Sequence, residues 1–156
     1  MAKRVTKGKT VATHRRARYD YDILQQFDAG IALLGSEIKS IREGRVTLNE
    51  GYARFRNHEL WLYNVHVAHY APARDNHEPT RPRKLLLHRR ELDRLEHELG
   101  ERPRTTVIVL RMYLHNGLAK VELGLARGRR TYDKRQVIRK REEDRAMQRA
   151  VRSAQR

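Results

Sequence analysis

The chain has 156 residues, 35% charged residues and a formal net charge of +16. It contains no cysteine, which excludes disulfides and cysteine-ligated zinc. The length suits one domain, and the basic composition predicts a polyanionic partner, because Lys and Arg side chains that meet phosphates release condensed counterions. The sequence contains no apolar run of membrane-spanning length, and neither basic end carries a wide apolar face, so we expect a cytosolic protein with no membrane partner.

The positive charge is concentrated at the two ends of the chain. Residues 127–156 hold twelve Lys/Arg against four Asp/Glu, and the first eighteen residues hold seven Lys/Arg and no acid. The segment between them is nearly neutral. We therefore expect a flexible basic tail over residues 1–13, a folded body over residues 14–126, and a basic tail from residue 127 to the end. This division predicts an adaptor whose body docks by shape and whose tails enter a field of phosphates.

Two extended segments are predicted at the start of the body. Apolar side chains recur from Tyr21 to Leu34 on both sides of Asp28-Ala29-Gly30, where the glycine allows a bend. A short helix is predicted over Ser36–Glu43, with Ser36 as its N-cap and Gly44 as its stop signal.

Two strands are predicted next, over Tyr52–Arg56 and Leu60–Val67, around an Asn-led turn. Residues 71–82 hold three prolines and predict a long loop, which in a compact domain is often functional. After Arg83–Leu87, a helix is predicted up to Gly100, because leucines recur at helical spacing. These leucines are Leu92, Leu95 and Leu99.

The last part of the body is predicted to be a hairpin. Thr105–Leu114 and Leu118–Leu125 are strand patterns, and Asn116-Gly117 between them favours a type I′ turn. Several short strands with two interposed helices predict a mainly β protein with helices. We expect an OB-like, closed antiparallel β-barrel flanked by short α-helices, with basic disordered N- and C-terminal tails.

The eight histidines do not form a catalytic or metal-binding set. His66 and His69 are three residues apart, a spacing that places them on opposite faces of a strand. His77-Glu78 precedes a proline and lacks the helix of a metallohydrolase motif, and no nucleophile elbow is present. We expect no enzymatic activity, no metal and no cofactor.

Basic side chains at the junction of the long loop and the second helix are candidate phosphate ligands. Arg81, Arg83 and Lys84 lie there, and arginine forks match phosphate oxygens. The competing interpretation is a solvated rim, and we favour a phosphate clamp on the body.

Aromatic side chains divide into two groups. Trp61, Tyr63 and Tyr52 fall in strand patterns, where burial is the usual outcome. Tyr132 instead lies among basic residues in a tail with no core to enter, so stacking on a nucleobase is the favoured interpretation. The basic neighbours of Tyr132 are Arg129, Arg130, Lys134 and Arg135.

The basic tail has good helix formers over Gln136–Ala150, but its arginines repeat at like-charge spacing and its apolar residues form no wide stripe. A helix this short is marginal in water. We expect the tail to be disordered alone and to become helical when phosphates neutralise its arginines.

Five ordered blocks make the chain resemble the SsrA-binding protein (small protein B) family, the bacterial partner of transfer-messenger RNA. The resemblance covers about His14 to Arg145. The blocks are Phe27–Ile31, Gly35–Arg42, Arg83–His88, Lys120–Ala126 and Tyr132–Arg135.

The resemblance implies an OB-like barrel that binds the tRNA-like domain of transfer-messenger RNA around its elbow. It implies RNA contacts by Asp28, Leu86 and Lys120, and we add Arg15 and Arg16 of the Arg-Arg-Ala run to this surface, together with Arg83 and Lys84. The tail would enter the vacant decoding centre and mRNA channel of a stalled 70S ribosome. The tail residues assigned to it are Arg129, Arg130, Tyr132, Asp133, Lys134 and Arg135.

The resemblance thus implies an adaptor of trans-translation, a monomer when free, that works by occupancy and electrostatics and breaks no bond. A structural ribosomal protein with a small barrel and basic extensions is the alternative from another class. An RNA-cleaving enzyme that uses histidines is the third possibility.

Overall fold

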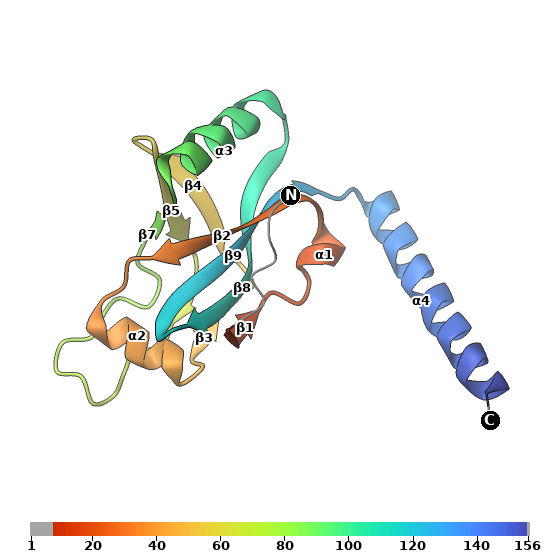
Figure 1. The fold of residues 1–156 in the computed structure, drawn as a ribbon, viewed down its shortest axis with the longest axis horizontal. Coiled ribbons are helices and arrows are strands. Elements are labelled where there is room, and N and C mark those ends of the chain that lie inside the picture. The colour runs from red at the N-terminus through yellow and green to blue at the C-terminus, as the bar shows by residue number, and fades with distance from the viewer. Residues whose placement is uncertain (1–7, 156) are drawn as a thin grey trace.

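A computed structural model describes residues 8–155, with the side chains of Thr131 and Tyr132 excepted. Figure 1 shows a β-rich body from which a long C-terminal helix projects. The elements in chain order are β1 (Lys9–Thr13), α1 (Ala17–Asp20), β2 (Tyr21–Ile31), α2 (Gly35–Arg42), β3 (Val46–Thr47), β4 (Tyr52–Arg56), β5 (Glu59–Tyr63), β6 (His66–Val67), β7 (Arg83–Leu86), α3 (Arg89–Glu101), β8 (Thr105–His115), β9 (Leu118–Gly128) and α4 (Thr131–Ala154).

The main sheet is antiparallel, and all its strands except β1 are hydrogen-bonded in a ring. Its order is β1-β8-β4-β5-β7-β2-β9, and β8 also pairs with β9. Strands β3 and β6 form a separate two-stranded sheet. The prediction of a mainly β protein with helices is confirmed.

The core fills the inside of this ring. Alternate residues of each strand point inward, as the period of a β-strand requires. The inward residues of β9, for example, are Val121, Leu123 and Leu125, all fully buried. Leu92 and Leu95 of α3 join the same core, as their helical spacing predicts. A smaller cluster beneath α1 holds Ala17, Ile108, Leu110 and Ala126.

Two predicted hairpin turns are confirmed. Asn116 and Gly117 have φ values of 50° and 75° and link β8 to β9. Asn57 and His58, with φ values of 51° and 59°, link β4 to β5. Two consecutive positive φ angles in a two-residue loop define the type I′ geometry, whose twist matches that of the flanking strands.

Three local predictions are wrong. The predicted bend at Asp28-Ala29-Gly30 is absent, because β2 is a single strand whose Gly30 pairs with both Leu86 and Lys120. Arg83–Leu86 forms strand β7 rather than a lead into a helix. Helix α2 begins at Gly35 rather than Ser36, and its N-cap is Leu34, whose N–H donates to the Glu37 side chain at 2.8 Å.

The two boundaries predicted for the body also change. Lys9–Thr13 pairs with the edge of β8, so the prediction of a flexible tail up to residue 13 is wrong for residues 9–13, while residues 1–7 lie outside the described part. Edge pairing uses backbone groups, and Val11 and Ala12 add apolar contact with the core. At the other end, β9 continues to Gly128, beyond the predicted boundary at Ala126.

The C-terminal tail forms the 24-residue helix α4, which extends away from the body (Figure 1). Every side chain described from residue 138 onward is exposed. The helix therefore draws little stability from tertiary packing, the main source of helix stability in proteins. That the tail is disordered alone and becomes helical when phosphates neutralise its arginines stays a prediction.

Candidate nucleic-acid interface

Three neighbouring strands bring Leu86, Gly30 and Lys120 into one row on the outer face of the sheet. Gly30 of β2 pairs with Leu86 of β7 on one side and with Lys120 of β9 on the other. A Cβ atom on Gly30 would lie 3.3 Å from the Cβ of Leu86, so the glycine leaves the surface between Leu86 and Lys120 free of a side chain. Leu86 is 50% exposed. Two of the predicted RNA-contacting residues are thus brought together, although they are 34 positions apart in the sequence.

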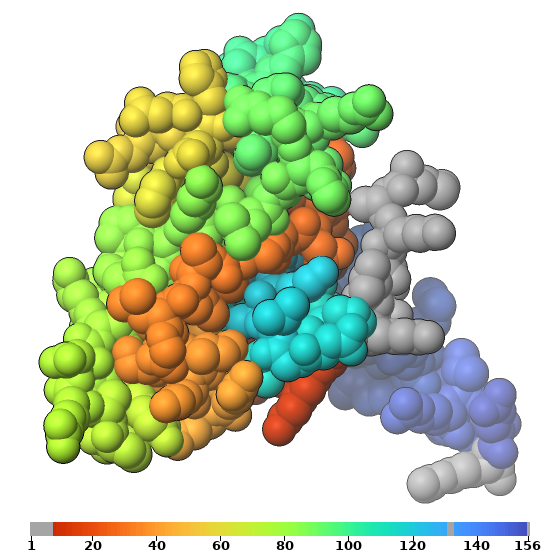
Figure 2. Space-filling view, turned by 60° about the vertical axis from the view of Figure 1, so that its left-hand side comes forward, coloured from red at the N-terminus to blue at the C-terminus, as the bar shows by residue number. Residues whose placement is uncertain are grey.

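The row forms the floor of an apolar hollow of about 420 Å³. Leu34 and Leu118, which are 50% and 65% exposed, stand on its walls. Arg42 also lines the hollow and donates a hydrogen bond to the Gly117 carbonyl at 3.4 Å. Figure 2 shows the face on which the orange segment of β2 and α2 adjoins the cyan tip of the β8–β9 hairpin. Exposed leucines beside cations suit a ligand with flat apolar surfaces and phosphates.

Asp28 lies on the same face of β2, two residues before Gly30. Its Oδ1 accepts a hydrogen bond of 2.9 Å from the Tyr113 hydroxyl. Burial and the hydrogen bond to Asp28 raise the pKa of Tyr113 to about 12, so the phenol stays protonated and remains a donor. Arg111 stacks over the Tyr113 ring at 4.6 Å and its Nε lies 3.1 Å from Glu122. The Asp28 carboxylate is therefore fixed in place.

Arg83 is not the phosphate ligand that the sequence suggested. The residue is 0% exposed, and its donors are taken by Glu37 Oε1 at 2.7 Å, the Val65 carbonyl at 2.8 Å and the Pro79 carbonyl at 3.0 Å. Arg81 also turns inward and binds both Glu37 oxygens, at 2.8 and 2.6 Å. The phosphate-clamp prediction is wrong for these two arginines, because both are paired with the buried Glu37 carboxylate in the first turn of α2.

Glu37 is the centre of this arrangement. Burial raises the pKa of its carboxyl, but the hydrogen bonds from Arg81, the Leu34 N–H and Arg83 lower it more, so the net pKa lies below its ordinary value. Burial in turn lowers the pKa of Arg83. These contacts tie α2 to the fifteen-residue connection, residues 68–82, that links β6 to β7.

Lys84, the third member of the predicted clamp, remains on the surface. Its side chain is 41% exposed, and its Nζ lies 2.9 Å from Glu59 Oε1. Lys84 is the cross-strand neighbour of Trp61 on the outer face. Trp61 and the stacked pair Tyr52 and Tyr63, with ring centroids 5.5 Å apart, are half-buried rather than part of the core.

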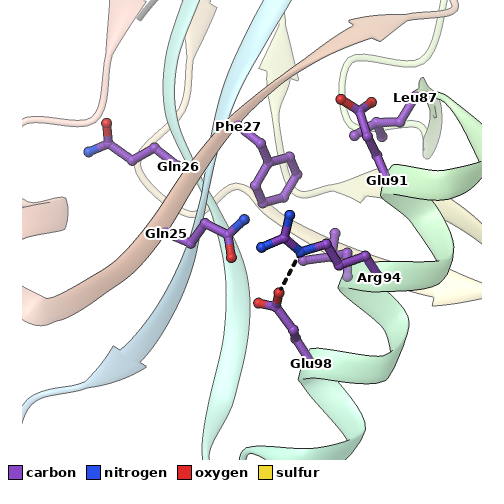
Figure 3. Close-up of a pocket in the computed structure, with 8 residues that line it drawn as sticks. Gln25, Gln26, Phe27, Leu87, Glu91, Arg94 and Glu98 are labelled. Atoms are coloured by element: carbon purple, nitrogen blue, oxygen red, sulfur yellow. Dashed lines mark hydrogen bonds and ion pairs between the residues drawn. The ribbon is translucent and has the colours of Figure 1, made fainter. Parts of the chain in front are cut away.

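A second hollow, of about 250 Å³, lies between β2 and α3. Figure 3 shows the ring of Phe27 pointing toward α3, while Arg94 and Glu98 meet on the helix. Arg94 Nε lies 3.1 Å from Glu98 Oε1, and Glu91 adds a second carboxylate to the lining. The acids outnumber the cations here, which disfavours contact with phosphates.

The remaining basic residues lie around α1 and the start of α4. Arg15 and Arg16 are exposed, and Arg16 lies 3.9 Å from Asp20. In the tail, Arg130, Asp133 and Arg135 are exposed. Arg129 and Lys134 instead face acidic residues of the body: Arg129 lies 3.8 Å from Asp22, and Lys134 lies 3.4 Å from Asp20. The side chain of Tyr132, predicted to stack on a base, lies outside the described part.

Two histidines have structural positions. His14 Nδ1 lies 3.1 Å from the Val109 carbonyl, and His77 bridges Ser36 Oγ and the Val67 carbonyl at 2.9 Å each. Ser36, predicted as an N-cap, thus binds His77. Within residues 8–155, the structure contains no group of three or more His, Asp or Glu placed to hold a metal ion. The helices of the same residues include none that is long and apolar enough to cross a membrane.

Sequence reasoning missed four residues of these surfaces: Arg42, Tyr113, Leu118 and Asp20. Arg42 and Leu118 are far apart in sequence and meet only through the hairpin. Tyr113 lies in a stretch that is apolar on both faces, so the sequence pattern did not show which face of the strand it occupies. Asp20 was visible only as one acid beside a basic run.

The chain is similar to proteins of known families. The chain is 48% identical to an SsrA-binding protein of Trichodesmium erythraeum, over 97% of this chain and 98% of the relative. It is 53% identical to an SsrA-binding protein of Roseiflexus castenholzii, over 92% of this chain and 91% of the relative.

A solved structure described as "tmRNA-SmpB: a journey to the center of the bacterial ribosome" contains a similar chain. The two share 44% identity with a TM-score of 0.65, over 82% of this chain and 94% of that one. The family model described as SmpB protein matches residues 11–153, which include the row Leu86, Gly30 and Lys120 and nearly all of α4. By these matches, the chain belongs to the SmpB protein family.

Proposed function

We propose that this chain is the RNA-binding adaptor of trans-translation. It binds the tRNA-like domain of transfer-messenger RNA and delivers that RNA to stalled ribosomes. There it places its C-terminal tail in the vacant decoding centre and mRNA channel, so that the nascent chain is tagged and the ribosome released. The protein contributes binding and positioning, and it breaks no bond itself.

The single observation that carries this proposal is the family match over residues 11–153, which spans both the body and the basic tail. The relatives that match are named for SsrA binding, and the similar solved chain is described with transfer-messenger RNA and the ribosome. An adaptor needs two separate surfaces, and this chain has a folded face and a long basic extension.

We assign the body face to transfer-messenger RNA. Lys120 is the phosphate ligand, Leu86 and the hollow beside it take apolar sugar and base surface, and Asp28 accepts a hydrogen bond from the RNA. Lys84, Arg15 and Arg16 extend the basic surface around it. Arg83 is left out because it is buried in the Glu37 ion pair.

We assign the tail to the ribosome, and we interpret the strand ring as an OB-like barrel. The tail residues proposed for the decoding centre are Arg129, Arg130, Tyr132, Asp133, Lys134 and Arg135. The outer faces of OB-like barrels bind oligonucleotides in other proteins, which agrees with the position of the Lys120 row.

The test is a titration of the purified protein with transfer-messenger RNA, its isolated tRNA-like domain, and an elongator tRNA as control. We expect tight, saturable binding to the first two and a weaker, strongly salt-dependent interaction with the third. The protein should join stalled ribosomes in substoichiometric amounts and only with that RNA present. Stoichiometric binding to translating ribosomes without it would favour the alternative, a structural ribosomal protein, and RNA turnover would indicate an enzyme.

A further inference from the structure

Two carboxylates of the body lie against the point where the C-terminal tail leaves it. Asp22, near the start of β2, lies 3.6 Å from the Arg127 guanidinium and 3.8 Å from that of Arg129. Asp20, the last residue of α1, lies 3.4 Å from Lys134 Nζ. Two acids therefore hold three cations at the junction of β9 and α4.

The backbone of the same segment is fixed almost up to the helix. Tyr21 pairs with Gly128 at the end of the β2–β9 ladder, and the Arg129 N–H adds one more hydrogen bond, to the Asp20 carbonyl at 2.9 Å. Helix α4 then begins at Thr131. Arg130, in an extended conformation with φ −73° and ψ 159°, is thus the single residue between the ladder and the helix.

Lys134, in the first turns of α4, reaches back to the body. Its Nζ lies 5.7 Å from the centroid of the Tyr19 ring, in addition to its contact with Asp20. The same ring receives Arg16 at 5.4 Å. Lys134 is only 33% exposed, while its neighbours Asp133 and Arg135 are exposed. One face of the first helical turn therefore rests on α1.

We propose that Asp20 and Asp22 are positioning residues that hold the first turn of α4 against α1 and so set the direction in which the tail leaves the body. This inference rests on the proposed function, because direction matters only to a tail that must enter a channel. We call the contacts of Asp20 and Asp22 with Arg127, Arg129 and Lys134 the tail latch.

The tail latch is strong enough to bias the direction and weak enough to open. Exposed ion pairs shift an equilibrium by at most about five-fold each. Arg129 Nε is buried and has no hydrogen-bond partner among the described residues, so the latch leaves one donor unused. RNA phosphates are stronger partners for these arginines than single carboxylates, because arginine forks match their geometry. Binding in the ribosome would therefore open the latch.

The latch is testable by distance measurement, and the absence of cysteine makes labelling simple. Leu24→Cys on β2 and Met147→Cys on α4 place two spin labels on residues that are 36% and 67% exposed. Pulsed electron paramagnetic resonance should give a narrow distribution of distances between the two labels at low salt. The distribution should broaden at about 1 M salt, where screening of the ion pairs is nearly complete. The pair Asp20→Asn and Asp22→Asn should broaden it at low salt as well.

The matched control is Glu43→Gln, which removes an exposed ion pair with Arg45 elsewhere on the body. This variant should leave the distribution narrow. Exchanging the charges, with Asp20→Lys and Lys134→Asp together, should restore the distribution lost in either single variant. A role of Lys134 in contacting the ribosome alone would not produce this restoration. An unchanged distribution in the double asparagine variant would overturn the proposal.

Activity provides the second readout. The double asparagine variant should bind transfer-messenger RNA as the wild type does, but tag stalled chains roughly five-fold more slowly. Tagging at the wild-type rate by a variant with a broadened distance distribution would show that the latch does not position the tail for tagging. Failure of the wild-type protein to bind this RNA would refute the proposed function, while the distance measurement would still decide whether the latch exists.

Discussion

Arg83 and Glu37 form an ion pair of 2.7 Å in which both side chains are shielded from solvent, with 1% and 0% exposure. The pair is buried, yet it helps to shape the face that we propose to bind RNA. Glu37 fixes the first turn of α2, and that helix supplies a wall of the hollow beside Leu86. Two arginines that resemble phosphate ligands in the sequence are thus part of the scaffold.

Glu37→Gln should destabilise the fold by about 3 to 5 kcal/mol, because it leaves a buried guanidinium without its counter-charge. The free energy of unfolding in urea measures this effect. The control is Glu59→Gln, which removes the exposed partner of Lys84 and should cost no more than about 1 kcal/mol. The contribution of Glu37 should be complete above its ordinary pKa of 4.5 and lost as the pH falls from there through its lower folded-state pKa. Equal losses in the two variants would contradict the structural role of Glu37.

Tyr113 should make stability depend on pH in the alkaline range. Its pKa is raised from 10.0 to about 12, so its contribution is fully present below pH 10 and is lost as the pH rises through about 12. The difference amounts to about 2 to 3 kcal/mol. Unfolding curves of the wild type and Tyr113→Phe, recorded across this range, isolate it, and tyrosinate absorbance gives the pKa directly. An Asp28→Asn variant should lower that pKa.

Lys120→Ala should weaken the binding of transfer-messenger RNA and reduce the slope of log affinity against log salt by about one, as expected for one lost phosphate contact. The fold should remain intact, because Lys120 points outward from the sheet. The matched control is Lys140→Ala on α4, which should leave this affinity unchanged. A salt slope that is the same in wild type and Lys120→Ala would exclude a phosphate contact at this position.

Local patterns in the sequence were sufficient where a single segment determines the outcome. The Asn116-Gly117 turn, the leucine face of α3 and the mainly β class all follow from short stretches. The misassignments concern interactions between distant segments. Gly30 was interpreted as a bend, since its strand partner Leu86 is 56 residues away and could not be recognised from the local sequence. Arg83 was interpreted as a phosphate ligand for the same reason, since its partner Glu37 is 46 residues away. Pairings of this kind are not encoded in local periodicity.

The candidate site shows the same division. The family resemblance predicted RNA contacts by Asp28, Leu86 and Lys120, and the structure places all three on one face of the sheet. It could not name Tyr113 as the partner of Asp28, because that contact depends on the register of β2, β9 and β8 together. Charge counting located the basic tail, but not the acids that receive its first cations.

Truncation after Arg130 should separate the two surfaces. The cut removes α4 but keeps β9 intact to Gly128. A cut before Arg127, the boundary predicted from charge, would remove the last two residues of β9. We expect unchanged affinity for transfer-messenger RNA and a complete loss of tagging of stalled chains. Gel-shift titration and a reconstituted tagging assay measure the two effects. A parallel fall in RNA affinity would mean that the tail is a main docking surface.

The isolated tail should be largely unfolded in dilute buffer, although it is helical in the full chain. A peptide of residues 127–156 lacks the contact of Lys134 with α1, and its side chains from residue 138 onward have no core to join. Circular dichroism should show little helix at low salt and more helix when a short RNA duplex supplies phosphates. The control peptide carries Arg141→Gln and Arg145→Gln, which remove like-charge repulsion at i, i+4 spacing and should raise the helix content without RNA. A strong helix in the unmodified peptide before RNA is added would show that α4 needs neither the body nor phosphates to form.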